Sequence, residues 1–326
     1  MAFRLKLVPE KTEWDFFRWA ILTFGASVAA IVGSIILVLV MGLNFGIDFK
    51  GGTTIRTEST AIVDIGAYRE ALDALEMGDV SITEVFDPSF REDQYVAMIR
   101  IQAQAGQEAL APEDVARVQA ALAKVVPDIK FASVETVGPK VSGELIMSAI
   151  LSVLAATVAI CAYVWLRFEW QFSLGAVAAL VHDVVVTVGI FALFQIKFDL
   201  TTIAALLTIL GYSINDTVVV FDRLRENLMK YKTMPLRDVM NLSVNETLSR
   251  TLMTSGSTLI TLASLMIFGG DVIRGFVFAI FMGILLGTYS SIYVAKNIVL
   301  YLGVKRDWSK PTDEAAGPKG NQLYGK

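Results

Sequence analysis

The stretch Leu206 to Asn227, LLTILGYSINDTVVVFDRLREN, decides the fold class of this chain. It is an apolar, β-branched-rich run that is long enough to cross a bilayer, yet it carries Asn215 and Asp216 within its length. A carboxyl group inside hydrocarbon costs about 2.5–3.5 kcal/mol at a helix centre, so it usually faces a protein interior or a wet cavity and has a partner. Asp216 is therefore the first candidate functional residue of an α-helical integral membrane protein.

The overall composition supports a membrane protein and excludes several other classes. Of the 326 residues, 54% are hydrophobic and 18% are charged, and the mean hydropathy is +0.57; soluble domains have about 25% charged residues. The net charge of −4 does not indicate a nucleic-acid partner, and neither GxxxxGK(S/T) nor GxGxxG occurs. Cys161 and His182 are the only residues of their kinds, so an internal disulfide and a histidine-based metal cluster are excluded. We expect no cofactor and no metal.

Six apolar runs have the length of a membrane span. They cover residues 20–43, 145–166, 172–194, 200–221, 248–268 and 276–302, the last five within a bundle region 143–302. Residues 1–19 form a polar segment, and the first run continues too far for a cleaved signal peptide, so we expect an uncleaved span. A polar, basic loop is expected over 222–247, and the charged, Gly/Pro-containing tail 303–326 is expected to be disordered.

Between the first two spans, residues 44–142 have the composition of a small soluble domain. Strand patterns and helical spacing alternate along it in the order β-α-β-β-α-β, which is the ferredoxin-like or split-βαβ order. The expected strands are 53–58, 80–87, 95–102 and 131–137, and the expected helices are 64–77 and 112–125. Two helices would cover one face of the sheet and leave the other face open.

The distribution of basic residues predicts the orientation in the membrane. With six spans, the segment 1–19, the loop 222–247 and the tail 303–326 all lie on one side, and all three carry Lys and Arg. By the positive-inside rule that side is the cytoplasm. The domain 44–142 would then be exported, which in a bacterial inner membrane means that it lies in the periplasm.

Asp216 has a candidate partner on the following span. It lies about 9 Å inside Asp222 at the rise of an α-helix, and Arg250 sits near the start of the next, antiparallel span. The two side chains could therefore meet at similar depth. A nearby guanidinium favours the charged carboxylate while burial favours the neutral acid, so protonation of Asp216 would release Arg250. A structural ion pair that locks the two helices is the alternative, and the sequence leaves both interpretations open.

The third span carries a second acidic candidate. His182 and Asp183 lie near its middle, and adjacent residues diverge by about 100° on a helix, so they need not share a partner. We expect a buried, hydrogen-bonded structural role for His182 and treat Asp183 as a secondary candidate for proton transfer. In the last span, Gly283 and Gly287 form a GxxxG pattern that we interpret as helix packing.

Four motifs give the chain a specific resemblance. They are GLNFGIDFKGG at 42–52, VGPKVSGEL at 137–145, LTILGYSINDTVVVFDRLREN at 207–227 and SRTLMTSGSTLITL at 249–262. With these motifs in this order, the sequence resembles the SecF family, the smaller membrane subunits of bacterial SecD–SecF protein-export complexes in the resistance-nodulation-division (RND) superfamily. The resemblance implies an RND-type half-bundle of six helices that a partner completes.

The resemblance also implies residue roles. Asp216 matches the intramembrane proton-accepting aspartate of the family, and Arg250 matches its arginine on the next helix. The resemblance implies a structural role for four further motif positions, which are Asp48, Gly51, Gly52 and Asn215. The segment that contains Asp48 lies at the junction of membrane and periplasm, where glycines suit a tight turn.

The implied function is that of a subunit driven by the proton-motive force, which with SecD promotes late translocation and release of polypeptides on the periplasmic side. SecD would complete the bundle; the SecYEG translocon, YajC, YidC, unfolded preprotein and membrane lipid are the other implied partners. One alternative is an RND-type small-molecule exporter subunit, and another is a scaffold of the export complex that transduces no energy. A membrane enzyme is not expected, because no nucleophile–base pair and no GxSxG is present.

Overall fold

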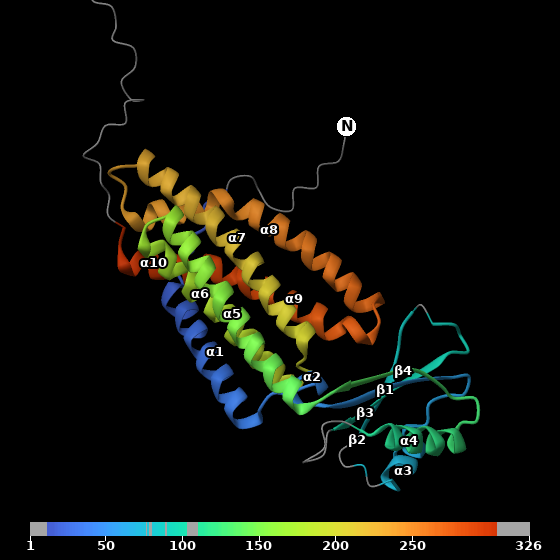
Figure 1. Ribbon diagram of the computed structural model, residues 1–326. Coiled ribbons are helices and arrows are strands. Elements are labelled where there is room, and N and C mark those ends of the chain that lie inside the picture. The colour runs from blue at the N-terminus through green and yellow to red at the C-terminus, as the bar shows by residue number, and fades with distance from the viewer. Residues whose placement is uncertain (1–11, 76, 78–79, 89, 103–109, 305–326) are drawn as a thin grey trace, which may run out of the picture.

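The computed structural model describes residues 12–75, 77, 80–88, 90–102 and 110–304. Long helices pack side by side into a bundle, and a small α/β domain lies at one end of it (Figure 1). Within the described residues, six helices are long and apolar enough to cross a membrane. The expected disordered tail and most of the segment 1–19 lie outside the described residues.

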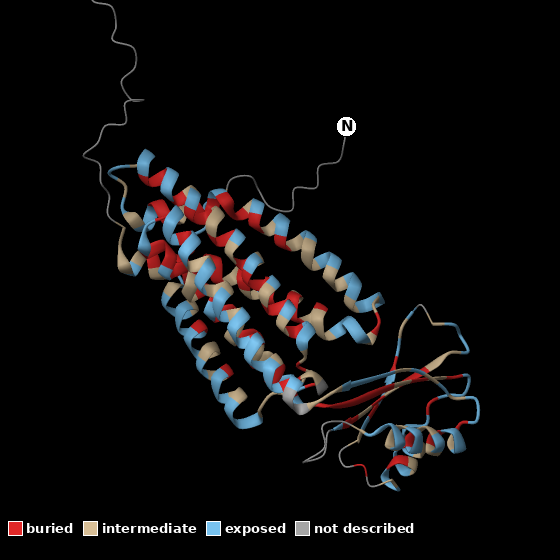
Figure 2. Ribbon diagram, in the orientation of Figure 1, coloured by how far each residue is buried: buried red, intermediate tan, exposed pale blue. Residues whose placement is uncertain are grey.

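The bundle contains every expected span. Its helices are α1 (Ala20–Met41), α5 (Pro139–Arg167), α6 (Trp170–Phe194), α7 (Leu200–Lys230), α8 (Leu236–Phe268) and a last span made of α9 (Asp271–Ser290), the π-helical turn η1 (Ser291–Ala295) and α10 (Lys296–Leu302). Helices α6 and α7 are the most buried spans, whereas α1 and α5 expose most of their apolar side chains (Figure 2). Such outward-facing apolar surface suits contact with lipid rather than water.

The expected polar loop 222–247 is wrong over most of its length. Helix α7 continues to Lys230 and α8 begins at Leu236, so only a short connection separates them. The reason is that both helices keep an apolar side beyond the membrane-spanning run: Leu228 of α7 and Met240 of α8 belong to one buried cluster. The drop in hydropathy therefore does not mark the end of either helix.

The domain has the predicted ferredoxin-like architecture. Its strands β1 (Gly52–Ser59), β2 (Val80–Val85), β3 (Tyr95–Gln102) and β4 (Lys130–Val137) form an antiparallel sheet in the order β2-β3-β1-β4, with α3 (Ile65–Asp73) and α4 (Pro112–Val125) between them. Both helices lie on one side of the sheet (Figure 1). Ile55 of β1 pairs with Ile99 of β3, and both pack against Tyr68, Val118 and Leu122 in a closed core.

The other face of the sheet lies over the end of the bundle. A cavity of about 300 Å³ separates them, lined by Thr54 and Met98 from the sheet and by Asp199 and Gly275 from the bundle. The domain therefore packs against the ends of the bundle helices, in addition to its covalent connections to α1 and α5.

Small residues let the central helices approach closely. A Cβ at Gly283 of α9 would overlap the Ile209 side chain of α7, and one at Gly287 would lie 3.1 Å from Ser213. The GxxxG pattern of the last span thus packs against α7. Similarly, Gly189 of α6 lies against Ser34 of α1.

Candidate functional site

Asp216 lies in the interior of the bundle. It is 3% exposed and faces α8 and α9 from α7. The Ser255 hydroxyl of α8 donates a hydrogen bond to Oδ2 of Asp216 at 3.1 Å, and the Thr288 hydroxyl of α9 donates to the Ser255 oxygen at 2.9 Å. Two hydroxyl groups therefore connect the carboxyl group to both neighbouring helices.

Arg250 does not meet Asp216 as expected from depth alone. Among the described residues, no hydrogen bond or ion pair joins them; Arg250 is exposed and influences Asp216 only through space. The cause is the rotation of α8, whose buried side carries Thr251 and Ser255, whereas Arg250 shares the exposed side with Thr254. Arg250 also lies about 7.5 Å along the helix from Ser255, toward the end of the bundle opposite the domain.

Asp183 of α6 is the centre of a second polar cluster. Its carboxyl group is completely buried, and Oδ2 accepts hydrogen bonds from the Ser213 hydroxyl of α7 at 2.6 Å and the Ser290 hydroxyl of α9 at 2.8 Å. Ser213 lies one turn from Asp216 on α7. The two acidic groups therefore occupy one polar layer that crosses α6, α7, α8 and α9.

His182 contacts its neighbour Asp183 directly, although adjacent helix positions diverge. Its Nδ1 lies 2.9 Å from Oδ1 of Asp183, and the ring is 1% exposed, which agrees with a hydrogen-bonded structural position. The ring centroid lies 6.0 Å from that of Tyr289. The Tyr289 hydroxyl donates to the Thr23 carbonyl of α1 at 2.8 Å and lies 3.0 Å from the Ser27 hydroxyl. The polar layer thus extends to α1.

A π-helical turn follows this layer in the last span. It covers Ser291–Ala295, directly after the residue that donates to Asp183. π-helical turns interrupt α-helices mainly at functional positions, because they alter the direction of side chains at a cost in helix regularity. The last span is thus irregular next to the acidic residue.

The sequence does not predict the hydroxyl residues of the layer. Ser213, Ser255, Thr288 and Ser290 carry the hydrogen bonds to the two acids. A Ser or Thr in an apolar helix commonly bonds its own backbone one turn earlier, as Thr288 also does with Ile284. The sequence therefore gives no signal that separates these four from the other hydroxyl residues of the spans.

Asn215 occupies a different side of α7 from Asp216. It is exposed, and among the described residues no side-chain hydrogen bond involves it. On the neighbouring α8, the exposed side carries Arg250, Thr254 and Ser257 within the span. Helices α7 and α8 therefore present a polar outer face at membrane depth.

The motif around Asp48 attaches the domain to α7. Asp48 lies in the short helix α2 (Ile47–Lys50), and its Oδ2 accepts a hydrogen bond from the backbone amide of Leu200, the first residue of α7, at 3.1 Å. The next residues turn the chain into β1: Gly51 has φ +74° and Gly52 has φ +142°, which L side chains rarely adopt. The two glycines thus have the turn role expected of them.

A second attachment joins the domain to α9. The amide of Phe86, just after β2, donates to Oδ2 of Asp271 at 2.9 Å, and the amide of Asp271 donates to the Phe86 carbonyl at 3.0 Å. Asp271 is the first residue of α9. The domain is therefore bonded to the first residues of the two helices that carry Ser213, Asp216, Thr288 and Ser290.

Comparison with known proteins identifies the family. A family model described as protein export membrane protein SecD/SecF, C-terminal, matches residues 117–305, and one described as SecD/SecF GG motif matches residues 36–60. A protein translocase subunit SecF of Cereibacter sphaeroides is 69% identical over 97% of this chain and 97% of its own length. The SecF of Ketogulonicigenium vulgare is 55% identical over 99% of this chain and 98% of its own length.

Solved structures agree with this relationship. A crystal structure of SecDF from Thermus thermophilus, a translocon-associated membrane protein, matches 91% of the chain with a TM-score of 0.79 at 34% identity. A second SecDF structure, in a super-membrane-facing form, matches the same share with a TM-score of 0.67 at 35% identity. In both cases the chain spans 39% of the length of the solved chain.

The fold and the polar layer define a multi-pass membrane protein with one folded domain at an end of its helix bundle. With the family models and the highly identical relatives, the particular family is clear. The chain belongs to the SecD/SecF family of protein-export membrane proteins and, within it, to the SecF subunits of the protein translocase.

Proposed function

We propose that this chain is an accessory subunit of the Sec translocase that uses the proton-motive force to promote late translocation and release of polypeptides. The observation that carries the proposal is the setting of Asp216: it is buried within a span, and its hydrogen-bond partner is the neutral hydroxyl of Ser255. A hydroxyl can donate to a carboxylate or accept from a carboxylic acid, so it suits both protonation states.

The proposed cycle connects protonation with movement of the domain. A proton that enters from the periplasm neutralises Asp216 and changes its hydrogen bond to Ser255, and the contact between α7 and α8 shifts. Helices α7 and α9 begin at Leu200 and Asp271, which are hydrogen-bonded to the domain. A shift of these helices would therefore move the domain. One charge that crosses 100 mV provides about 2.3 kcal/mol, which biases a two-state equilibrium by a factor of about 50.

The topology that we propose follows the charge distribution. The domain lies in the periplasm of a bacterium, and the segment 1–19 and the tail lie in the cytoplasm, on either side of the inner membrane. In support, the helix ends around Lys230 and Leu236 lie at the end of the bundle opposite the domain (Figure 1). The basic residues of that connection thus lie where the positive-inside rule expects them.

We propose that SecD covers the polar outer face of α7 and α8. This face exposes Asn215, Arg250 and Thr254 at or near membrane depth. An arginine in contact with lipid is costly, so a second protein surface that provides a partner would relieve it. In this proposal Arg250 lies at the interface with SecD, where it finds a partner, and its charge acts on Asp216 through space. SecYEG, YajC, YidC and an unfolded preprotein are proposed partners on family resemblance alone.

Asp183 is proposed as a secondary position of the relay. Its three polar contacts, with groups of α6, α7 and α9, hold it more tightly than Asp216 is held by Ser255. We propose a non-enzymatic role for the chain as a whole; in support, the carboxyl, hydroxyl and imidazole groups of the polar layer contact one another.

The test is in vitro translocation in vesicles that contain the chain, SecD and the translocon. Asp216→Asn should abolish the ionophore-sensitive part of preprotein completion. The matched control is Asp222→Asn on the same helix, whose side chain is exposed and pairs with Arg167 at 3.0 Å. Ionophore-sensitive completion that survives in Asp216→Asn would disprove the relay.

Separating a scaffold from a relay requires a double variant. Asp216→Asn combined with Arg250→Gln removes both charges while it keeps the side-chain sizes similar. A relay predicts that translocation stays defective although the complex with SecD still assembles. Full recovery of export in the double variant would instead establish the scaffold.

A further inference from the structure

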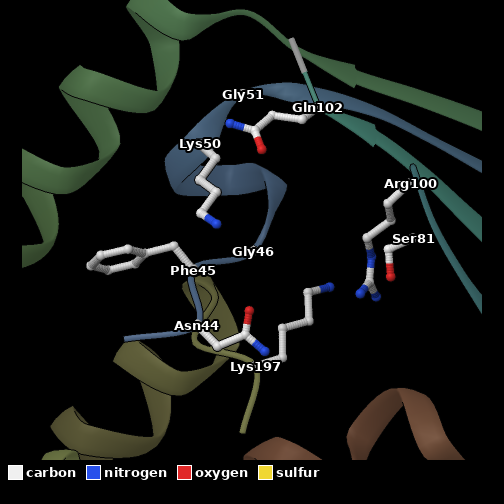
Figure 3. A pocket seen from close by; sticks show the side chains of 9 residues that line it. All are labelled: Asn44, Phe45, Gly46, Lys50, Gly51, Ser81, Arg100, Gln102 and Lys197. Carbon is white, nitrogen blue, oxygen red and sulfur yellow. The ribbon is translucent and has the colours of Figure 1, made fainter. Parts of the chain in front are cut away.

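A polar cavity of about 160 Å³ lies between the domain and the bundle (Figure 3). Lys50 from α2, Arg100 from β3 and Lys197 from the α6–α7 turn extend their charged groups into it, and none of the described residues that line it is acidic. Ser81 and Gln102 add neutral polar groups to its wall. The cavity thus gathers three cationic side chains from three different elements.

None of the three cationic groups has an ionic partner among the described residues. Within the part of the chain that the structure describes, neither lysine makes a side-chain hydrogen bond or an ion pair, and a guanidinium nitrogen of Arg100 reaches only the sulfur of Met98, at 2.9 Å. Nε of Arg100 is buried without a partner. Burial lowers the pKa of Arg100, and burial together with the nearby Arg100 lowers the pKa of Lys197. Arg100 and Lys197 are therefore partly buried cations without an ionic partner among the described residues, and such cations favour a bound anion.

Three carboxylates act on these cations, and two of them are engaged at the start of α7; the third, Glu135 of β4, acts on Lys197 through space. Asp48 and Asp199 act on Arg100 and Lys197 through space, but their oxygens accept hydrogen bonds at the start of α7. Asp48 accepts from the Leu200 amide and Asp199 from the Thr202 amide. These two acids thus stabilise the first turn of the helix, and neither belongs to the residues that line this cavity, although both line the neighbouring cavity of about 300 Å³ with Arg100 and Lys197.

A glycine lies against the side chain of Lys197. A Cβ at Gly46 would lie 2.9 Å from Cε of Lys197 and 3.3 Å from Cβ of Asp199. Glycine at this position therefore lets the lysine side chain lie across the backbone and reach the cavity. Close packing therefore places Lys197 at the cavity, whereas Lys50 reaches it from an exposed position.

We propose that this cavity binds a phosphate group, supplied by the headgroup of a phospholipid. Arginine presents a planar fork that suits phosphate oxygens, and lysine adds point charge. The cavity adjoins the ends of α6 at Phe194 and of α7 at Leu200, so it lies at the level expected for headgroups. A phosphate bound here bridges Arg100 of the domain and Lys197 of the bundle.

The experiment uses the full-length chain in detergent and isothermal titration calorimetry. The probes are dihexanoylphosphatidylglycerol, inorganic phosphate and dihexanoylglycerol, which lacks the phosphate. The short phosphatidylglycerol should bind, and Lys197→Gln and Arg100→Gln should each weaken its binding about tenfold or more. Lys124→Gln, the same change at an exposed position on α4, should leave the affinity unchanged. Dihexanoylglycerol should not bind.

Two more variants separate loss of the site from loss of the fold. Lys197→Arg keeps the charge and should bind within about threefold of the natural chain, because arginine also binds phosphate. Ser81→Trp fills the cavity without a change of charge and should abolish binding.

The outcomes decide between the sources of phosphate. Competition of inorganic phosphate with the phosphatidylglycerol supports the shared phosphate chemistry. Binding of inorganic phosphate alone, lost in Lys197→Gln, would overturn the lipid source and leave a site for a soluble anion. Equal affinities in Lys197→Gln, Arg100→Gln and Lys124→Gln would overturn the site altogether.

Discussion

The carboxylate of Asp48 accepts a hydrogen bond from the backbone amide of Leu200 at 3.1 Å, so the segment that leads into the domain binds the first residue of α7. The amides at the start of a helix have no partner within the helix, and negative charge is favourable there. Asp199 satisfies the amide of Thr202 in the same turn. Two carboxylates from separate segments therefore stabilise the start of the helix that carries Asp216.

Asp48→Ala should destabilise the chain by about 1 kcal/mol, the usual cost of losing a side-chain acceptor at a helix start. Asp48→Asn should cost less, because its amide oxygen can still accept the bond. Thermal unfolding of the full chain in detergent measures both changes. The control is Asp73→Ala, an exposed aspartate on α3. An unfolding temperature of Asp48→Ala equal to that of the control would contradict the role of this bond.

Close packing of α7 and α9 leads to a second prediction. Gly283→Ala places a methyl group against Ile209 and should destabilise the bundle by about 1–3 kcal/mol, because the two helices must separate. Gly211→Ala on α7 is the matched control, since nothing lies within 4 Å of its Cβ position. That change should be neutral or stabilise the helix by up to about 1 kcal/mol. Equal unfolding temperatures of the two variants would show that the glycine is not needed for packing.

The spans and the domain follow from local sequence patterns, and these predictions agree with the structure. Runs of apolar residues and the alternation of strands and helices depend on neighbouring residues alone. The segment 222–247 shows where such patterns fail. Its charges are compatible with helix, because Arg223 pairs with Glu226 one turn later at 2.6 Å and with Glu246 of α8 at 2.7 Å. Polarity alone could not separate an extramembrane helix from a loop.

The partner of Asp216 could not be derived from depth along the helices. Depth correctly indicates that α8 supplies a neighbour, but the rotation of α8 decides which residue faces α7. That rotation follows from how all the helices pack, and it turns Ser255 inward and Arg250 outward. Likewise, the contact of His182 with Asp183 depends on side-chain conformations that no periodicity specifies. The cost of a carboxyl group in a membrane indicates the acids of the site from the sequence, but it does not indicate their hydrogen-bond partners.

The segment before α1 is bound to α8 through two asparagines. The Asn245 oxygen accepts from the amide of Trp14 and the Asn241 oxygen from that of Phe16, each at 2.9 Å, and both side-chain amides donate to the Trp14 carbonyl. The double variant Asn241→Ala, Asn245→Ala should raise amide hydrogen exchange at Trp14 and Phe16 by about tenfold or more. Asn215→Ala, an exposed asparagine on α7, should leave it unchanged. Unaltered exchange in the double variant would show that other contacts hold the segment.

The domain should show a defined dependence of stability on acid pH. Hydrogen bonds from the hydroxyl and the amide of Thr60 lower the pKa of Asp128. A carboxyl group with a lowered pKa in the folded state stabilises the fold above its unfolded pKa of about 3.9, and that contribution is lost as pH falls through the folded pKa. Thr60→Val should therefore lower the unfolding temperature at pH 6, and the difference from the natural chain should shrink at pH 3. A difference that is the same at both pH values would contradict the assignment.

The two buried acids should respond differently to neutralisation. The carboxyl group of Asp183 accepts hydrogen bonds from Ser213 and Ser290 and contacts His182. In Asp183→Asn, an NH₂ donor replaces one of the two carboxyl oxygens that these three groups surround. It should destabilise the bundle by about 1–3 kcal/mol, measured by thermal unfolding in detergent. Asp216→Asn keeps an oxygen for its hydrogen bond from Ser255, so it should unfold within about 1 kcal/mol of the natural chain while it loses ionophore-sensitive export. The opposite order, an unstable Asp216→Asn beside a stable Asp183→Asn that has lost proton-dependent export, would assign the relay to Asp183 and leave Asp216 as the structural group.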